Sequence, residues 1–304
     1  MKQMKKYHGV VVPMVTPLTT TGEIDPVSVN NLLENFVEAG VSPLLMGTTG
    51  EGNSLSHAQA VELTRLAANA SNHRITIYAC LTGLCVEDQL KEADALSEAG
   101  ADVLASTLPG YYALTDEQIF QYYTQIADHV KVPFMLYNIK ATTHMSIPVD
   151  VVLRLADHPN IVGLKDSERN DPRMEELLGK LSGRSDFSYF CGCAANSAKA
   201  LALGADGIVP SGGNFIPKMY AGLFNAGWNG DTEKAELLQT STDRLGEIYQ
   251  QGFTLGESLA ALKVICHKAG LITTTCMLRP LTQLDAATTL RIEDATETQV
   301  MNNL

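Results

Sequence analysis

Lys165 is the residue whose position most directly indicates chemistry. It ends the apolar run Ile161-Val162-Gly163-Leu164, so its side chain is expected to enter a largely desolvated interior where the charged ammonium is disfavoured. A neutral amine can attack a carbonyl carbon and form a Schiff base. The structural alternative pairs the lysine with Asp166 or with another carboxylate, and position alone does not choose between these interpretations.

A glycine-bracketed loop supplies a second set of candidate groups. The segment Gly47-Thr48-Thr49-Gly50-Glu51 offers backbone amides and two hydroxyls, which suit a ketone that carries a carboxylate. It is neither a P-loop, because no Lys-Ser or Lys-Thr follows at the required spacing, nor a G-x-G-x-x-G dinucleotide turn. A tight turn with capping threonines is the structural alternative. We expect Glu51 to organise this loop and not to act as a base.

Two tyrosine sites complete the candidate groups. Tyr137 ends the run 133–137, one strand before Lys165, where its hydroxyl could transfer protons. It could equally be a packed aromatic side chain with a solvated tip. Tyr112 follows the run 102–105. The seven histidines and six cysteines show no zinc spacing, so we expect no metal and no cofactor.

The elements that must position these groups alternate in type along the chain. Short buried runs alternate with amphipathic stretches of about a dozen residues, which is typical of βα units around a parallel sheet. The eight predicted strands are 10–15, 43–46, 75–80, 102–105, 133–137, 161–165, 187–190 and 206–209. We therefore predict an α/β fold, a (β/α)8 barrel over residues 1–228, with a C-terminal helical extension over 229–304. Active sites of such barrels form where the strands end.

Charge and hydrophobicity exclude several classes of partner. The 304-residue chain is 45% hydrophobic and carries a net charge of -12, which disfavours binding to nucleic acid or to anionic membranes. No run approaches the roughly 20 apolar residues of a membrane span, and the stretch 10–15 is unlike a secretion signal. We expect a cytoplasmic protein.

Five motifs of the chain resemble those of the dihydrodipicolinate synthase and N-acetylneuraminate lyase superfamily of Schiff-base enzymes. They occur in the family's order and near its spacing, from about Gly9 to Trp228. The motifs are Gly47-Thr48-Thr49-Gly50-Glu51, Pro109-x-Tyr111-Tyr112, Tyr137-Asn138, Gly163-x-Lys165-Asp166 and Ser211-x-x-Asn214-x-x-Pro217.

The resemblance implies roles for individual residues. Lys165 would form the Schiff base, Tyr137 would relay protons, and Thr48 would link Tyr137 to Tyr112. In part of the family the tyrosine at the position of Tyr112 reaches into the neighbouring subunit, which implies a homo-oligomer, a dimer or a tetramer. Thr49 and Val209 would contact pyruvate. We assign Gly47, Ser167 and Ser211 to the substrate site as well.

Two departures from the family's patterns bear on the substrate. Lysine-pathway synthases carry an arginine for a substrate carboxylate where this chain has Thr142, although Lys140 lies close by in sequence. Losing a bidentate charged donor weakens binding of an anionic co-substrate. Sialic acid lyases carry acidic residues in the segment that here reads Gly192-Cys193-Ala194. Both of the best-known activities are therefore disfavoured.

The remaining prediction is a pyruvate-dependent aldolase, a carbon-carbon lyase. Its substrate would be a 2-keto-3-deoxy sugar acid or a 4-hydroxy-2-oxo acid, with pyruvate or another 2-oxo acid and an aldehyde as its partners. The alternatives are 4-hydroxy-tetrahydrodipicolinate synthase, N-acetylneuraminate lyase or dehydratase activity, and a barrel that only senses a 2-oxo acid. The sequence leaves open the aldehyde, the stereochemistry, the favoured direction and whether Lys140 binds a distal carboxylate.

Overall fold

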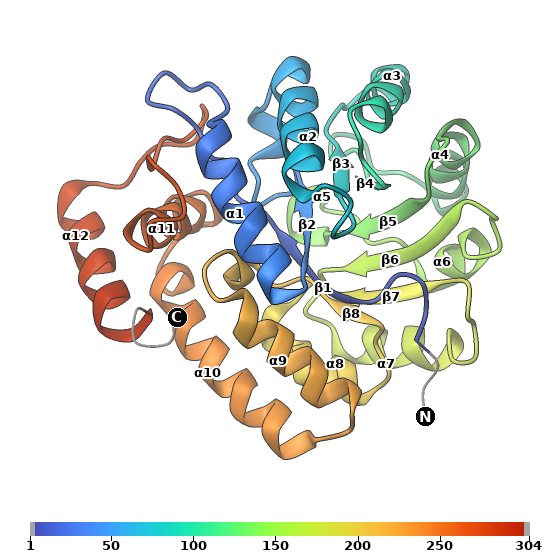
Figure 1. Ribbon diagram of the computed structural model, residues 1–304. Helices are drawn as coiled ribbons and strands as arrows, with labels where there is room; N and C mark the ends of the chain where they lie inside the picture. Colours follow the sequence, from blue (N-terminus) through green and yellow to red (C-terminus); the bar gives the residue numbers. More distant parts are fainter. Residues whose placement is uncertain (1–3, 301–304) are drawn as a thin grey trace.

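Eight parallel strands close into a barrel in the computed structural model, which describes residues 4–300 (Figure 1). The strands lie in the order in which they occur along the chain, and β8 pairs with β1. They are β1 (Gly9–Pro13), β2 (Ser42–Leu45), β3 (Tyr78–Leu81), β4 (Val103–Thr107), β5 (Phe134–Asn138), β6 (Ile161–Asp166), β7 (Ser188–Cys191) and β8 (Gly207–Ile208). The chain is thus the TIM barrel predicted from its sequence.

Helices surround the strands and cover their outer faces (Figure 1). Those of the barrel are α1 (Pro26–Ala39), α2 (His57–Ser71), α3 (Val86–Glu98), α4 (Asp116–His129), α5 (Lys140–Thr143), α6 (Val149–Leu155), α7 (Asp171–Lys180), α8 (Ser197–Ala202) and α9 (Pro217–Trp228). Capping boxes open α2 at Ser56 and α4 at Thr115. Both starts are visible in sequence as Ser or Thr followed by Gln at the third position.

Three further helices follow the barrel: α10 (Thr232–Gln250), α11 (Leu255–Lys268) and α12 (Ala286–Ala295), with a last turn η4 (Thr296–Val300). They lie together on one side of the molecule, coloured orange to red in Figure 1. α10 packs along α9 and also contacts α8 and α11. No helix within residues 4–300 is both long enough and apolar enough to cross a membrane.

Asn214 forms hydrogen bonds at the place where β8 meets β1 and the barrel closes. It is fully buried in the turn η3 (Ser211–Asn214) after β8. Its amide nitrogen donates to the carbonyl oxygens of Pro13 and Ser211, and its amide oxygen accepts from the Val15 N–H. The short strand β8 is therefore joined to the end of β1 by side-chain bonds as well as by the ladder.

Two strand ends differ from the predicted ranges for identifiable reasons. The third strand begins at Tyr78 and not at residue 75, because the Asp102 carboxylate accepts the Ile77 N–H at 2.8 Å. The second strand ends at Leu45 because Met46 adopts a left-handed conformation, with φ of 52°. That bend turns the chain into the 47–51 loop.

Candidate active site

Lys165 and Tyr137 face each other at the end of neighbouring strands. The parallel ladder pairs their Cα positions directly, β5 against β6. Residues in the same register on adjacent strands point to the same face of a sheet. Both side chains are buried, with 5% and 2% of their surfaces exposed. Lys165 Nζ lies 3.7 Å from the centroid of the Tyr137 ring, so the amine and the aromatic side chain share one small volume.

Asp166, the neighbouring carboxylate, is not a partner of Lys165. It lies on the opposite face of β6, where Arg173 Nε donates to it at 2.8 Å and Asn138 Nδ2 at 2.8 Å. Among the described residues, no carboxylate forms an ion pair with Lys165. The alternative of a lysine neutralised by Asp166 therefore does not apply, and its amine is left available for another role.

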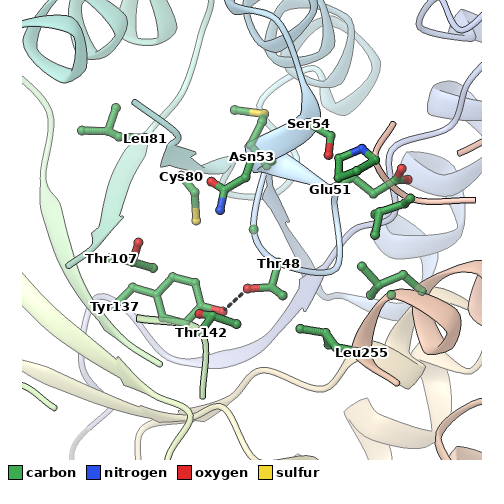
Figure 2. Close-up of a pocket in the computed structure, with 17 residues that line it drawn as sticks. Thr48, Glu51, Asn53, Ser54, Cys80, Leu81, Thr107, Tyr137, Thr142 and Leu255 are labelled. Atoms are coloured by element: carbon green, nitrogen blue, oxygen red, sulfur yellow. Dashed lines mark hydrogen bonds between the residues drawn. The ribbon is translucent and has the colours of Figure 1, made fainter. Parts of the chain in front are cut away.

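Thr48 brings the loop after β2 to the same place. Its Oγ1 and the Tyr137 hydroxyl share a hydrogen bond of 3.2 Å, and the two side chains point toward each other in Figure 2. In this loop the backbone passes very close to other backbone atoms at two glycines. A Cβ added at Gly52 would lie 1.9 Å from the Met46 carbonyl oxygen, and one at Gly50 would lie 2.8 Å from that of Met14. Only glycine fits at both positions.

Glu51 anchors this loop to the C-terminal helices. It adopts a left-handed conformation with φ of 56°, and its buried carboxylate forms an ion pair with Lys263 of α11 and accepts the Leu278 N–H at 2.9 Å. Lys263 Nζ also donates to the Cys276 carbonyl oxygen at 2.7 Å. Burial lowers the pKa of the Lys263 ammonium, which the negative charge of Glu51 opposes. The pair therefore joins barrel and extension through a buried interaction.

A cavity of about 340 Å³ lies in front of Lys165, and we name it the reaction chamber. Predicted site residues that line it are Lys165, Tyr137, Thr48, Thr49, Ser167, Val209 and Ser211. The C-terminal helices close its other side with apolar residues, including Leu259 and Leu262 of α11. The structure thus brings seven of the nine predicted site residues around one volume.

Gly47 and Tyr112 are the two predicted site residues outside the reaction chamber. Gly47 lines a second cavity of about 340 Å³, which shares Thr48 and Tyr137 with the chamber (Figure 2). Tyr112 lies in the loop after β4 with 71% of its surface exposed. In the described part of the chain no hydrogen bond joins it to Thr48. The predicted link from Thr48 to Tyr112 is therefore not formed within one chain over the described residues.

The second cavity contains a thiol that stays protonated near neutral pH. Cys80 of β3 lines it beside Thr107. Burial raises the pKa of the Cys80 thiol to about 12, although the charge of Lys165 acts in the opposite direction. A thiol with so high a pKa is a poor nucleophile, so Cys80 is not a candidate nucleophile.

Comparison with known proteins identifies the family of the chain. The sequence profile of the Dihydrodipicolinate synthetase family matches residues 6–299. The chain belongs to this family. It is a carbon-carbon lyase.

Individual relatives include both aldolases and synthases. "Putative 2-dehydro-3-deoxy-D-gluconate aldolase YagE" of Escherichia coli is 27% identical over 94% of this chain and 94% of its own. A 4-hydroxy-tetrahydrodipicolinate synthase of Alkalilimnicola ehrlichii is 30% identical over 91% and 93%. The solved structure of dihydrodipicolinate synthase from Acinetobacter baumannii, complexed with pyruvate, superimposes with a TM-score of 0.87 at 29% identity, covering 95% of this chain and 98% of that one.

The two segments in which this chain departs from the family's patterns line different cavities. Thr142, at the position of the synthases' arginine, lines the second cavity and not the reaction chamber. Gly192, Cys193 and Ala194 line the reaction chamber and bring no carboxylate to it. Residues 4–300 contain no group of three or more His, Cys, Asp or Glu side chains placed to hold a metal ion.

Sequence reasoning missed three contributors to the site. The Tyr249 hydroxyl of α10 shares a hydrogen bond of 2.8 Å with Ser211 Oγ, and burial raises the pKa of this hydroxyl, so it stays protonated. Lys263 holds the loop through Glu51. Arg169, four residues after Lys165, lines the mouth of the chamber. Arg169 could have been found from the sequence because it lies only four residues after Lys165. Tyr249 and Lys263 could not, because both belong to the C-terminal helices, far from the motifs in sequence.

The Glu51 and Lys263 pair generates a stability prediction. Lys263→Met leaves a buried carboxylate without its counter-charge, which should lower the free energy of unfolding by about 3–5 kcal/mol. Glu51→Gln together with Lys263→Met removes both charges and should recover much of that loss. Urea denaturation of the two single variants and the double variant measures it. A double variant as unstable as the sum of the single variants would contradict the pairing.

Glu168 generates a prediction on acid stability. Burial raises the pKa of its carboxyl, but hydrogen bonds from Ser146 and Asn138 and the charges of Arg173 and Lys140 outweigh burial, so the net pKa is lowered. A lowered pKa contributes stability above the unfolded value, near 4.5, and that contribution is lost as the pH falls through the folded value.

Denaturation curves from neutral pH to below 4.5 test this. Glu168→Gln should unfold more easily at neutral pH and lose less stability on acidification than the unmodified chain. Glu62→Gln, on the exposed face of α2, is the matched control. An equal acid dependence for Glu168→Gln and the unmodified chain would count against the role assigned to Glu168.

Proposed function

We propose that this chain is a pyruvate-dependent aldolase that forms a Schiff base on Lys165. Its substrates would be 2-keto-3-deoxy sugar acids or 4-hydroxy-2-oxo acids. The observation that carries the proposal is the buried Lys165 amine, which has no carboxylate partner among the described residues and lies against Tyr137 at the barrel mouth. The aldolase and pyruvate complex among the relatives support it.

In the first step, the neutral Lys165 amine attacks the ketone carbon of the 2-oxo acid. The carbonyl oxygen leaves as water after taking one proton from the amine and one from an acid, for which Tyr137 is positioned. The product is an iminium ion whose positive charge lies against the Tyr137 ring, where a cation is stabilised by the ring's negative face. The electron-withdrawing iminium then weakens the C3–C4 bond.

Bond cleavage requires removal of the proton on the C4 hydroxyl. Tyr137, left as a phenolate after it supplied a proton in the first step, accepts that proton, and the Thr48 hydroxyl stabilises the phenolate through the hydrogen bond that the two side chains share. The C3–C4 electron pair moves into the enamine, and an aldehyde leaves. Protonation of the enamine at C3 and hydrolysis of the imine then release pyruvate and regenerate Lys165. In the opposite direction, the enamine attacks an aldehyde.

The other predicted site residues would hold the substrate. Thr48 and Thr49 offer hydroxyls and backbone amides to the substrate carboxylate, and Val209 would pack against the methyl end of pyruvate. The amine itself supplies the electron sink, so the mechanism uses no metal and no nucleotide. Exposed Tyr112 supports assembly into a dimer or tetramer, in which it would approach Thr48 of a neighbouring copy.

Trapping with borohydride tests the lysine. Incubation with pyruvate and borohydride should produce a reduced adduct that peptide mass spectrometry places on Lys165. Lys165→Arg, which keeps a long basic side chain but cannot form the imine, should give no adduct and no pyruvate release from 2-keto-3-deoxy acids. An adduct on another lysine, or none, would show that the proposed mechanism is wrong.

Removing the Tyr137 hydroxyl separates its two contributions. Tyr137→Phe keeps the ring beside Lys165, so pyruvate should still be trapped, although more slowly because the acid for imine formation is lost. The rate of aldol cleavage should fall by about 10²- to 10⁴-fold because the proton relay is lost. Thr48→Val should show a smaller loss. Single-turnover release of the aldehyde measures both, and unchanged cleavage in Tyr137→Phe would remove the relay from the mechanism.

Synthase activity is the second candidate, because one relative at 30% identity is a 4-hydroxy-tetrahydrodipicolinate synthase. Both activities begin with the same imine and differ in the later steps. Only the aldolase releases an aldehyde from a 2-keto-3-deoxy acid. Turnover with pyruvate and aspartate semialdehyde alone would favour the synthase, and trapping without any turnover would favour a 2-oxo acid sensor.

A further inference from the structure

An open groove continues outward from the reaction chamber. It has a volume of about 580 Å³ and is lined by Lys140, Ala141 and the segment 167–172, and we name it the outer groove. Ala141, Ser167 and Arg169 line both spaces. A substrate whose ketone lies at Lys165 can therefore extend past these three residues into the outer groove.

The charges of the outer groove are unbalanced. Arg169 and Lys140 are exposed, and in the described part of the chain neither forms an ion pair or a side-chain hydrogen bond. The two carboxylates of the groove are already engaged. Asp171 binds Lys199 at 2.8 Å and Asn196 at 3.0 Å, and Glu168 accepts hydrogen bonds from Asn138 and Ser146. Over the described residues, Arg169 and Lys140 thus have no ion pair at the mouth of the chamber, although Lys140 is near enough to Glu168 for its charge to lower the pKa of that carboxyl.

The loop that carries Arg169 is held firmly at both of its ends. Asp166 accepts from Arg173 and Asn138, and the Glu168 N–H donates back to Asp166 at 3.1 Å. Asn170 caps α7 through the Arg173 N–H. These contacts fix the backbone on either side of Arg169 while leaving its guanidinium unpaired. A guanidinium on a fixed loop suits recognition of a carboxylate or a phosphate.

We propose that Arg169, assisted by Lys140, binds an anionic group at the end of the substrate remote from its ketone. The inference rests on the proposed function and narrows its substrate class to 2-oxo-4-hydroxy acids that carry a terminal carboxylate or phosphate. Ser167 lines both the reaction chamber and the outer groove, so it would lie beside the carbon chain between the two ends. Arg169 is then the residue that determines specificity, whereas Lys165 and Tyr137 determine the reaction.

Three substrates that share the reacting end test the proposal. 2-Keto-3-deoxygluconate ends in a hydroxymethyl group, its 6-phosphate ends in a phosphate, and 2-keto-3-deoxyglucarate ends in a carboxylate. The unmodified enzyme should cleave at least one anionic substrate with a higher kcat/KM than the neutral one. Whether the carboxylate or the phosphate is preferred identifies the anion.

Variants show whether Arg169 is responsible. Arg169→Gln should lower kcat/KM for the preferred anionic substrate by about tenfold, mainly through KM, because a charge-assisted contact at a partly exposed site is lost. Arg169→Lys should retain part of the preference, and Arg169→Gln with Lys140→Gln should abolish it. For the neutral substrate, kcat/KM should fall much less than for the anionic one. Arg65→Gln, an exposed arginine of α2, is the control and should leave all three substrates unaffected.

Pyruvate trapping distinguishes a failure of the Arg169 inference from a failure of the proposed function. Pyruvate has no distal group, so Arg169→Gln should form the reduced Lys165 adduct as readily as the unmodified enzyme. Two results, each with normal trapping, would overturn this inference alone. In the first, the unmodified enzyme cleaves the neutral substrate as well as or better than the anionic ones. In the second, Arg169→Gln lowers kcat/KM equally for the neutral and the anionic substrates. Absence of trapping in the unmodified enzyme would overturn the proposed function and this inference with it.

Discussion

The pairing of β5 with β6 is the constraint on which the site depends. Its register sets Tyr137 opposite Lys165 and Asn138 opposite Asp166. Because side chains alternate between the two faces of a strand, the first pair enters the barrel and the second faces the helices. A slip of one residue would exchange these faces and place the amine outside. The positions of both pairs, Tyr137 with Lys165 and Asn138 with Asp166, therefore follow from the register of these two strands.

Asn138 and Asp166 connect the strand ends to residues outside the barrel. Asn138 and Asp166 gather Arg173 and Glu168 into a buried polar network immediately behind the reactive strand ends. Arg173 Nη2 is buried in this network without a hydrogen-bond partner in the described structure, so the network is not fully satisfied. The site thus has a back made of hydrogen bonds between strands and α7, and a front made of loops and the apolar side chains of α11.

The sequence predicted the parts of this arrangement that are local. Lys165 and Tyr137 could be found because each ends its own apolar run, and the barrel could be predicted because the alternation of strands and helices repeats eight times. Contacts between distant segments left no such pattern. Lys263 lies within an ordinary amphipathic stretch, and only the fold shows that it meets Glu51, far earlier in the chain. The start of β3 likewise depends on Asp102, a side chain that lies just before β4.

The ion pair between Glu51 and Lys263 also bears on how such enzymes can change during evolution or design. A buried charge must keep its counterpart, so the loop and α11 cannot vary independently at these two positions. A chimera that grafted the last helices of a relative onto this barrel would have to import a matching lysine or change both residues together. The C-terminal helices and the 47–51 loop are thus coupled at these two positions, and exchanging one without the other would leave a buried charge unpaired.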